Sequence, residues 1–339
     1  MTPADALGAV LLAALVAYAL LAGADYGGGI WDLLAGGPRK AEQRALIEHA
    51  IGPIWEANHV WLILVVVVLF TGFPPAFAAL STALFWPLVL LLVGIVLRGS
   101  AFTFRTYQAG DAAQARWGVV FSGASVVTPL LLGLAVGALA SGRLRIAEGG
   151  MARSAALDAL TPFTLATGLL ACALFGFLAA VYLAVEADGA LREDFRRRAL
   201  LAAAAVFATA LAAALLARAE APQVWSGLTR RGFSIGLHLA TGAAAVAAIG
   251  ALLARRLRLA RLAAAAQVML IVVGWGASQY PYLVVPDVTL QAASAPRATQ
   301  VALLVALAAG ALTLFPSLWL LFRVFKGERP FAVLQRPPR

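Results

Sequence analysis

Long apolar runs separated by short polar segments dominate the chain. In the clearest run, every residue from Val60 to Phe70 is apolar, and two prolines follow it at positions 74 and 75. A helix rises about 1.5 Å per residue, so about 20 apolar residues cross the hydrocarbon core of a bilayer. The pattern predicts nine spanning helices, at 5–24, 51–72, 77–97, 117–140, 161–185, 199–217, 233–253, 262–279 and 299–324.

The composition agrees with a membrane protein. Of the 339 residues, 62% are hydrophobic and 12% are charged, whereas soluble domains are about half apolar and about a quarter charged. A net charge of +10 would suggest a nucleic-acid partner for a soluble chain. In a membrane protein, positively charged cytoplasmic loops explain it better. We therefore expect one polytopic membrane domain over residues 1–339 and no nucleic-acid partner.

The lysine and arginine residues indicate an orientation. Most of the 26 lie in the first, third, fifth and seventh loops and in the C-terminal tail. By the positive-inside rule, these segments are cytoplasmic, the N-terminus is outside and the C-terminus is cytoplasmic. A miscounted helix would scramble this alternation, so the charge bias also supports the count of nine spans.

Polar residues enter the second predicted helix where a charge is costly. An isolated charge at membrane depth costs at least about 2.5–3.5 kcal/mol on insertion scales, and Glu56 stands directly before the apolar run. Helical spacing places Glu56 and His59 on one face, and Trp55 and Asn58 on a neighbouring face. A carboxylate beside an imidazole is a candidate pair for handling protons.

The first predicted helix ends in the segment AGADYGGGIWD. Gly23 and Gly27 form a small-xxx-small pair that permits close helix contact, and the three glycines at 27–29 indicate either a helix break or a tight approach. Asp25 is a candidate proton-entry residue, and a carboxylate at the membrane edge facing water or a positive loop is the alternative. Asp32 is interpreted as interfacial.

The third predicted helix is followed by arginines in the segment RGSAFTFR. Arg98 and Arg105 could hold a carboxylate or a lipid headgroup, but anchoring at the cytoplasmic membrane surface is the favoured interpretation. Haem ligation needs His, Met or Cys side chains facing a cavity. The three histidines, His49, His59 and His238, are too few and too scattered for several haems, so we expect no haem and no metal in this chain.

Several segments together carry a resemblance to a known family. They read AGADYGGGIWD, GPIWEANHVWLI, RGSAFTFR, VYLAVEADGALREDFRRR and YPYLVVPDVTL. With the nine-helix count, they resemble subunit II of the cytochrome bd-type quinol oxidases over nearly the whole chain. The most specific part is the set Trp55, Glu56, Asn58 and Trp61. The Gly-Arg-Gln-Pro-Trp signature that marks subunit I of these oxidases is absent, and the first acid of the family's helix-one pattern falls on Ala22.

The resemblance implies a fold of two four-helix bundles plus one peripheral helix. It implies a heterodimer in the bacterial inner membrane with a subunit I that holds two b-type haems and one d-type haem. That complex oxidises quinol and reduces dioxygen to water with cytoplasmic protons. Subunit II would scaffold subunit I and assist proton uptake. Membrane lipid, a structural quinone and a small single-helix subunit are further partners that the resemblance allows.

The site residues expected from the motifs fall into two groups. Glu56, Asp25 and His59 are candidates for proton transfer. The second group contains motif or interface residues: Trp55, Asn58, Trp61, Arg98 and Arg105.

Two other functions fit the residues. A proton-coupled secondary transporter would also place a carboxylate such as Glu56 in a helix bundle, although we find no inverted repeat in the sequence. In a purely structural subunit, Glu56 would be hydrogen-bonded across a subunit interface. Co-purification separates the transporter from the oxidase subunit, because the oxidase subunit should bring a coloured, haem-bearing partner.

Overall fold

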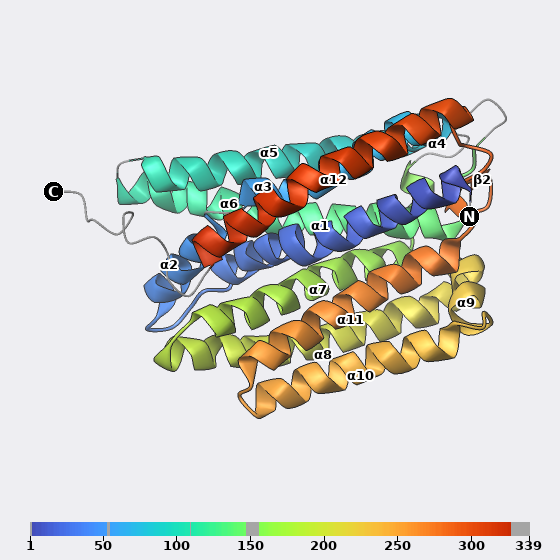
Figure 1. Cartoon of the computed structure of the whole chain (residues 1–339). Coiled ribbons are helices and arrows are strands. Elements are labelled where there is room, and N and C mark those ends of the chain that lie inside the picture. The colour runs from blue at the N-terminus through green and yellow to red at the C-terminus, as the bar shows by residue number, and fades with distance from the viewer. Residues whose placement is uncertain (1, 53–54, 109, 147–155, 327–339) are drawn as a thin grey trace.

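The computed structural model describes residues 2–52, 55–108, 110–146 and 156–326, which are almost entirely helical (Figure 1). The α-helices are α1 (Pro3–Leu33), α2 (Lys40–Ile51), α3 (Trp55–Gly72), α4 (Pro74–Ala83), α5 (Phe85–Tyr107), α6 (Asp111–Ser141), α7 (Pro162–Glu186), α8 (Gly189–Glu220), α9 (Pro222–Thr229), α10 (Ser234–Leu253), α11 (Leu257–Gln279) and α12 (Arg297–Lys326). A short 3-10 turn, η1 (Ala156–Ala159), precedes α7, and strands β1 (Tyr282–Val284) and β2 (Val288–Thr289) form an antiparallel hairpin before α12.

Nine of the described helices are long and apolar enough to cross a membrane: α1, α3, α5, α6, α7, α8, α10, α11 and α12. They form two four-helix groups and one outer helix. Bundle one contains α1, α3, α5 and α6, and bundle two contains α7, α8, α10 and α11. Helix α12 packs only on the outside of bundle one, against α1 and α3 (Figure 1). The predicted fold class is therefore confirmed.

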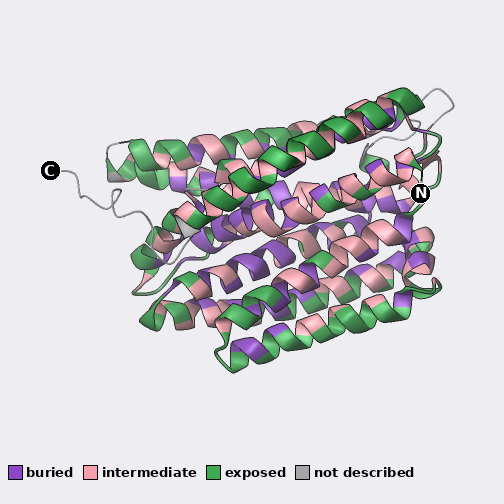
Figure 2. Ribbon diagram, viewed as in Figure 1, coloured by how far each residue is buried: buried purple, intermediate pink, exposed green. Residues whose placement is uncertain are grey.

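Helix α1 is the central element of the molecule. It contacts α3 and α6 in its own bundle, and α7 and α11 in the other. Figure 2 shows buried residues concentrated along α1 and α7, whereas exposed residues cover much of α10 and α12. A capping box begins α1: the Thr2 hydroxyl accepts from the Asp5 amide, and the Asp5 carboxylate accepts from the Thr2 amide. Pro3 fits the first helical turn because its missing N–H needs no partner there.

Several predicted helix boundaries are wrong; α8, for example, begins at Gly189 and not at residue 199. Two of the errors have identifiable reasons. The predicted third span, 77–97, covers parts of two helices, because the backbone leaves helical geometry at Leu84, between α4 and α5. The spanning helix then continues to Tyr107, past Arg98 and Arg105. The predicted first span stops at residue 24, whereas α1 continues through Asp25 to Leu33. In both helices, the charged residues that suggested an end lie inside the protein with partners.

The glycines of α1 permit a close approach, and the helix does not break at them. A Cβ atom added to Gly27 would collide with the backbone carbonyl oxygen of Phe175 on α7. The Trp31 indole N–H donates to the carbonyl oxygen of Gly176, also on α7, with an N–O distance of 2.7 Å. The predicted close contact at Gly27 is therefore confirmed, and it joins bundle one to bundle two.

We expect the Gly27→Ala substitution to destabilise the packing of α1 on α7, because the backbone of α7 cannot move aside as a flexible side chain would. Overpacking of this kind costs about 1–3 kcal/mol. Thermal unfolding of the purified protein measures the loss. Gly123→Ala on α6 is the matched control, because a Cβ there meets nothing within 4 Å. Equal melting temperatures for the two variants would contradict the close contact.

Candidate functional site

A cluster of polar side chains lies inside bundle one, between α1, α3, α5 and α6. Asp25 of α1 and Asn58 of α3 are 4% and 2% exposed. The Asn58 Nδ2 atom donates to Asp25 Oδ2 across 2.7 Å. The interpretation of Asp25 as an acid facing water is therefore wrong, because the amide of a second helix binds the carboxylate inside the bundle.

Arg98 also lies inside the protein, and its interpretation as a surface anchor is wrong. Its side chain is 1% exposed. The guanidinium carbon lies 4.8 Å from the ring centre of Tyr26 and 5.3 Å from that of Phe121, and Nε donates to the Ser125 hydroxyl. Aromatic faces attract a guanidinium through their quadrupole. Its Nη2 atom is buried without a hydrogen-bond partner among the described residues.

His59 of α3 lies against two tyrosines of α1. Its ring centre is 5.9 Å from that of Tyr18 and 5.7 Å from that of Tyr26. The two tyrosine hydroxyl oxygens lie 3.2 Å apart. The His59 Nδ1 atom is buried without a partner in the described part of the chain. This arrangement places an imidazole and two hydroxyl groups side by side in a buried setting.

A second buried carboxylate lies one to two turns further along α1. Asp32 is fully buried, so its interpretation as an interfacial residue is wrong. Its Oδ1 atom pairs with Arg105 Nη1 at 3.0 Å, and its Oδ2 atom accepts from the Ser122 hydroxyl at 2.7 Å. Arg105 is also 3.9 Å from Glu48. Arg105 thus holds a carboxylate, one of the roles considered for it, although anchoring at the membrane surface was the favoured interpretation.

Glu56 does not join this cluster. It is exposed on α3, and no hydrogen bond or ion pair involves it among the described residues. It lines an open pocket of about 600 Å³ together with Glu48, His49 and Trp55. The predicted pairing of Glu56 with His59 is absent there, because His59 turns toward the tyrosines of α1 while Glu56 faces outward.

The two motif tryptophans have different surroundings. Trp55 lies near His59 and Phe102, with ring centres 6.3 Å and 6.0 Å apart respectively. Trp61 is buried and lies 6.4 Å from Phe315 of α12. Trp55 therefore borders the pocket, and Trp61 packs against α12, the outer helix.

The three histidines lie on different helices in different surroundings. His49 lines the pocket on α2, His59 lies among aromatic rings, and His238 Nδ1 lies 2.7 Å from the Ser234 carbonyl oxygen on α10. No group of three or more His, Cys, Asp or Glu side chains gathers among the described residues in a way that could hold a metal ion.

Sequence reasoning missed four polar members of the cluster: Tyr18, Tyr26, Ser122 and Ser125. The tyrosines are eight residues apart, which places them two turns apart on one helix face, and this spacing could have paired them. Ser122 carries no local signal, because its partner Asp32 is 90 residues away in the chain.

These features define the class of protein to which the chain belongs. The chain is a polytopic membrane protein in which the buried carboxylates of bundle one, Asp25 and Asp32, are bound by side chains of neighbouring helices. The family follows from comparison with known proteins. The family model for cytochrome bd terminal oxidase subunit II matches residues 5–325, and the chain belongs to that family.

Individual relatives agree with the family. The cytochrome bd ubiquinol oxidase subunit 2 of Bacillus subtilis (strain 168) is 35% identical over 131 residues, which cover 37% of each chain. The cytochrome bd-I ubiquinol oxidase subunit 2 of Escherichia coli (strain K12) is 28% identical over 196 residues, covering 56% of this chain and 50% of that one. The chain thus spans a third to a half of the length of these relatives.

Longer matches come from two further comparisons. A putative cytochrome bd menaquinol oxidase subunit II of Bacillus subtilis (strain 168) is 24% identical over 328 residues, covering 93% of both chains. A chain in the structure of bd oxidase from Geobacillus thermodenitrificans is similar with a TM-score of 0.82 and 24% identity, covering 97% of this chain and 100% of that one. At this identity the structural likeness establishes the fold.

We expect Arg105→Gln to destabilise the protein by less than the cost of about 3–5 kcal/mol for a buried charge without any partner, because Arg44 Nε still lies 3.7 Å from the buried Asp32 carboxylate. Adding Asp32→Asn to that variant should restore part of the loss, because the weakly compensated charge is then gone. Thermal unfolding of both variants checks this. Arg116→Gln serves as control, since Arg116 is exposed on α6. Equal stability of Arg105→Gln and Arg116→Gln would contradict the role of the pair.

Proposed function

We propose that this chain is the second, haem-free subunit of a quinol:oxygen oxidoreductase. In this role it scaffolds a haem-bearing subunit I and assists the uptake of cytoplasmic protons for the reduction of dioxygen to water. The observation that carries the proposal is the family match over residues 5–325. It argues against the proton-coupled transporter, which the sequence alone had left open. The haems of the partner would carry out the redox chemistry.

The face of α3 and α5 supports the docking of a partner there. Large apolar side chains are exposed on both helices, among them Ile63, Phe70, Trp86 and Leu92. Glu56 precedes Ile63 by seven residues and therefore shares its face of α3. An uncovered carboxylate at membrane depth is costly. Contact with subunit I would enclose both the apolar side chains and the pocket that Glu56 lines.

The different positions of Glu56 and Asp25 support the role in proton uptake. Glu56 stands at an open pocket, where it can exchange protons with water. Asp25 stands inside the bundle, bound to Asn58. His59, beside the tyrosines of α1, has buried hydrogen-bonding capacity that no described residue uses. We propose that protons enter at the Glu56 pocket, and that Asp25 and His59 belong to the polar path beyond it.

The charge distribution supports the orientation. The arginine-rich segments around α2, the start of α8 and the turn between α10 and α11 gather at one end of the bundle. We propose that this end faces the cytoplasm, with the beginning of α1 outside. The pocket of Glu56 then opens on the side from which protons are taken.

We expect Glu56→Gln to spare assembly, because Glu56 has no described partner, and to slow quinol-driven oxygen consumption by about 100-fold. That is the low end of what a positioned proton-transfer group contributes. Glu56→Asp should retain part of the rate. Glu42→Gln, on the exposed side of α2, is the control. A normal rate in the assembled Glu56→Gln complex would refute the proton role and leave the scaffold role standing.

We expect the protein purified from its own membranes to bring a second, larger polypeptide and a reduced-minus-oxidised spectrum with b- and d-type haem bands. The bands should be absent from this chain expressed alone, because the haems are proposed to lie in the partner. A colourless preparation of this chain without a partner would contradict the oxidase function while leaving the fold unaffected.

A further inference from the structure

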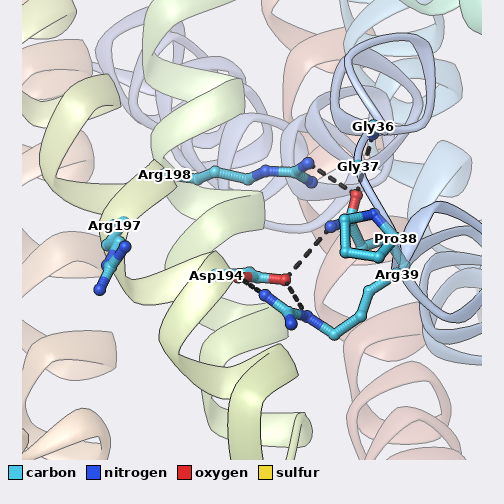
Figure 3. A pocket seen from close by; sticks show the side chains of 8 residues that line it. Gly36, Gly37, Pro38, Arg39, Asp194, Arg197 and Arg198 are labelled. Carbon is cyan, nitrogen blue, oxygen red and sulfur yellow. Dashed lines mark hydrogen bonds and ion pairs between the residues drawn. The ribbon is translucent and has the colours of Figure 1, made fainter.

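A basic pocket lies at the arginine-rich end of the molecule, away from the polar cluster of bundle one. It has a volume of about 290 Å³ and lies between the α1–α2 loop and the first turns of α8. Its lining includes Arg39, Arg197 and Arg198 and one carboxylate, Asp194. The guanidinium groups of Arg39 and Arg198 face the pocket, whereas the Arg197 side chain points away from Asp194 and lies at the rim (Figure 3). We propose that this pocket binds the phosphate of an anionic phospholipid. The proposal is independent of the oxidase function.

The single carboxylate of the pocket is already neutralised. Arg39 holds Asp194 with two hydrogen bonds, from Nε at 2.7 Å and from Nη2 at 2.6 Å. The Gln43 amide donates a third, at 3.2 Å. A two-pronged arginine–carboxylate pair is the strongest common form of this interaction. Arg39 and Asp194 therefore cancel each other, and the charge that remains belongs to the other two arginines.

Arg198 is held by neutral groups. Its Nη2 atom donates to Gln43 Oε1 at 2.7 Å and to the Leu34 carbonyl oxygen at 3.3 Å. Its guanidinium carbon lies 5.4 Å from the ring centre of Trp31 and 5.1 Å from that of Phe195. Figure 3 shows the side chain reaching from α8 across to the loop. It forms no ion pair with a described residue, so its position is fixed and its charge is uncompensated.

Arg197 supplies a second, more accessible charge. Its side chain is 73% exposed, and its Nε atom is 3.3 Å from Glu193. Glu193 also pairs with Arg196 at 2.6 Å and Arg255 at 3.7 Å. One carboxylate shared among three arginines leaves an excess of positive charge at the rim. Such basic pockets between spanning helices suit a phosphate-bearing headgroup.

The edges of the pocket favour a lipid over a free anion. Leu33 and Leu34 are exposed at the end of α1, and Leu201 is 70% exposed on α8, close to the two arginines along the helix. Gly36 and Gly37 form part of the lining, and a Cβ atom added to either would meet nothing within 4 Å. A charged hollow with an open mouth and an apolar edge matches an amphiphile, with its phosphate in the pocket and its chains along the leucines.

The test uses the intact complex, incubated with phosphatidylglycerol or with phosphatidylcholine, and counts bound lipids by native mass spectrometry. We expect phosphatidylglycerol to bind more tightly. Arg197→Gln and Arg198→Gln should each weaken its binding about fivefold, as expected from about 1 kcal/mol for each arginine at a membrane surface. Arg218→Gln is the matched control, because Arg218 is exposed on the same helix at its opposite end. It should leave the affinity unchanged.

The outcomes separate the alternatives. Glu193 is the only described residue with which Arg197 forms an ion pair, and the Arg197 side chain is 73% exposed. Arg197→Gln should therefore fold normally, and it decides the result if Arg198→Gln fails to assemble. Equal affinity of wild-type and Arg197→Gln complexes for phosphatidylglycerol would overturn the proposal. Displacement of the bound lipid by an equal concentration of inorganic phosphate would also overturn it, because the site would then bind free phosphate. The proposal would be supported if only Arg197→Gln and Arg198→Gln lowered the affinity for phosphatidylglycerol and if inorganic phosphate did not displace the lipid bound to the wild-type complex.

Discussion

A charge inside the hydrocarbon layer needs a partner within the protein, and this constraint organises bundle one. Two carboxylates of α1, Asp25 and Asp32, lie seven residues apart and are almost completely buried. Asn58 of α3 binds the first, and Arg105 of α5 binds the second. A buried carboxylate left without its partner costs several kcal/mol. The two contacts therefore fix two spanning helices around a third, which makes α1 the axis of the bundle.

The junction between the two bundles depends on close packing of helices and contains no buried ion pair between α1 and α7 among the described residues. Lipid chains are as apolar as leucine side chains, so the hydrophobic effect alone does not press helices together in a membrane. At Gly27 the absence of a side chain lets the backbone of α7 approach closely, and the Trp31 indole then reaches the Gly176 carbonyl. Close packing and one interhelical hydrogen bond thus join the halves. Helix α1 therefore carries buried polar contacts to α3 and α5 and a close glycine contact to α7.

The number of spanning helices could be predicted from the sequence, but which residues of different helices contact one another could not. The number of spans follows from hydropathy alone, because each crossing needs about 20 apolar residues. Errors arose where a charge was interpreted as the end of a span, as at Asp25 and Arg98, because hydropathy does not register a partner on another helix. The break at Leu84 has one local signal, Pro87, because a proline is tolerated in the first turn of a helix such as α5 but not in a helix interior. The Asp25–Asn58 contact joins residues 33 positions apart, and only the packing of α1 on α3 brings them together.

Asp25 and Glu56 are both acids that were expected to handle protons, and their physical situations differ. Asp25 has a hydrogen-bond partner within the chain, because the Asn58 amide binds its carboxylate inside bundle one. Glu56 is exposed and has no partner among the described residues, so any partner that it has must come from outside them. In the proposed complex, that partner lies at the interface with subunit I. Assembly would then create the setting in which Glu56 works, and the scaffold role and the proton role would converge on one residue.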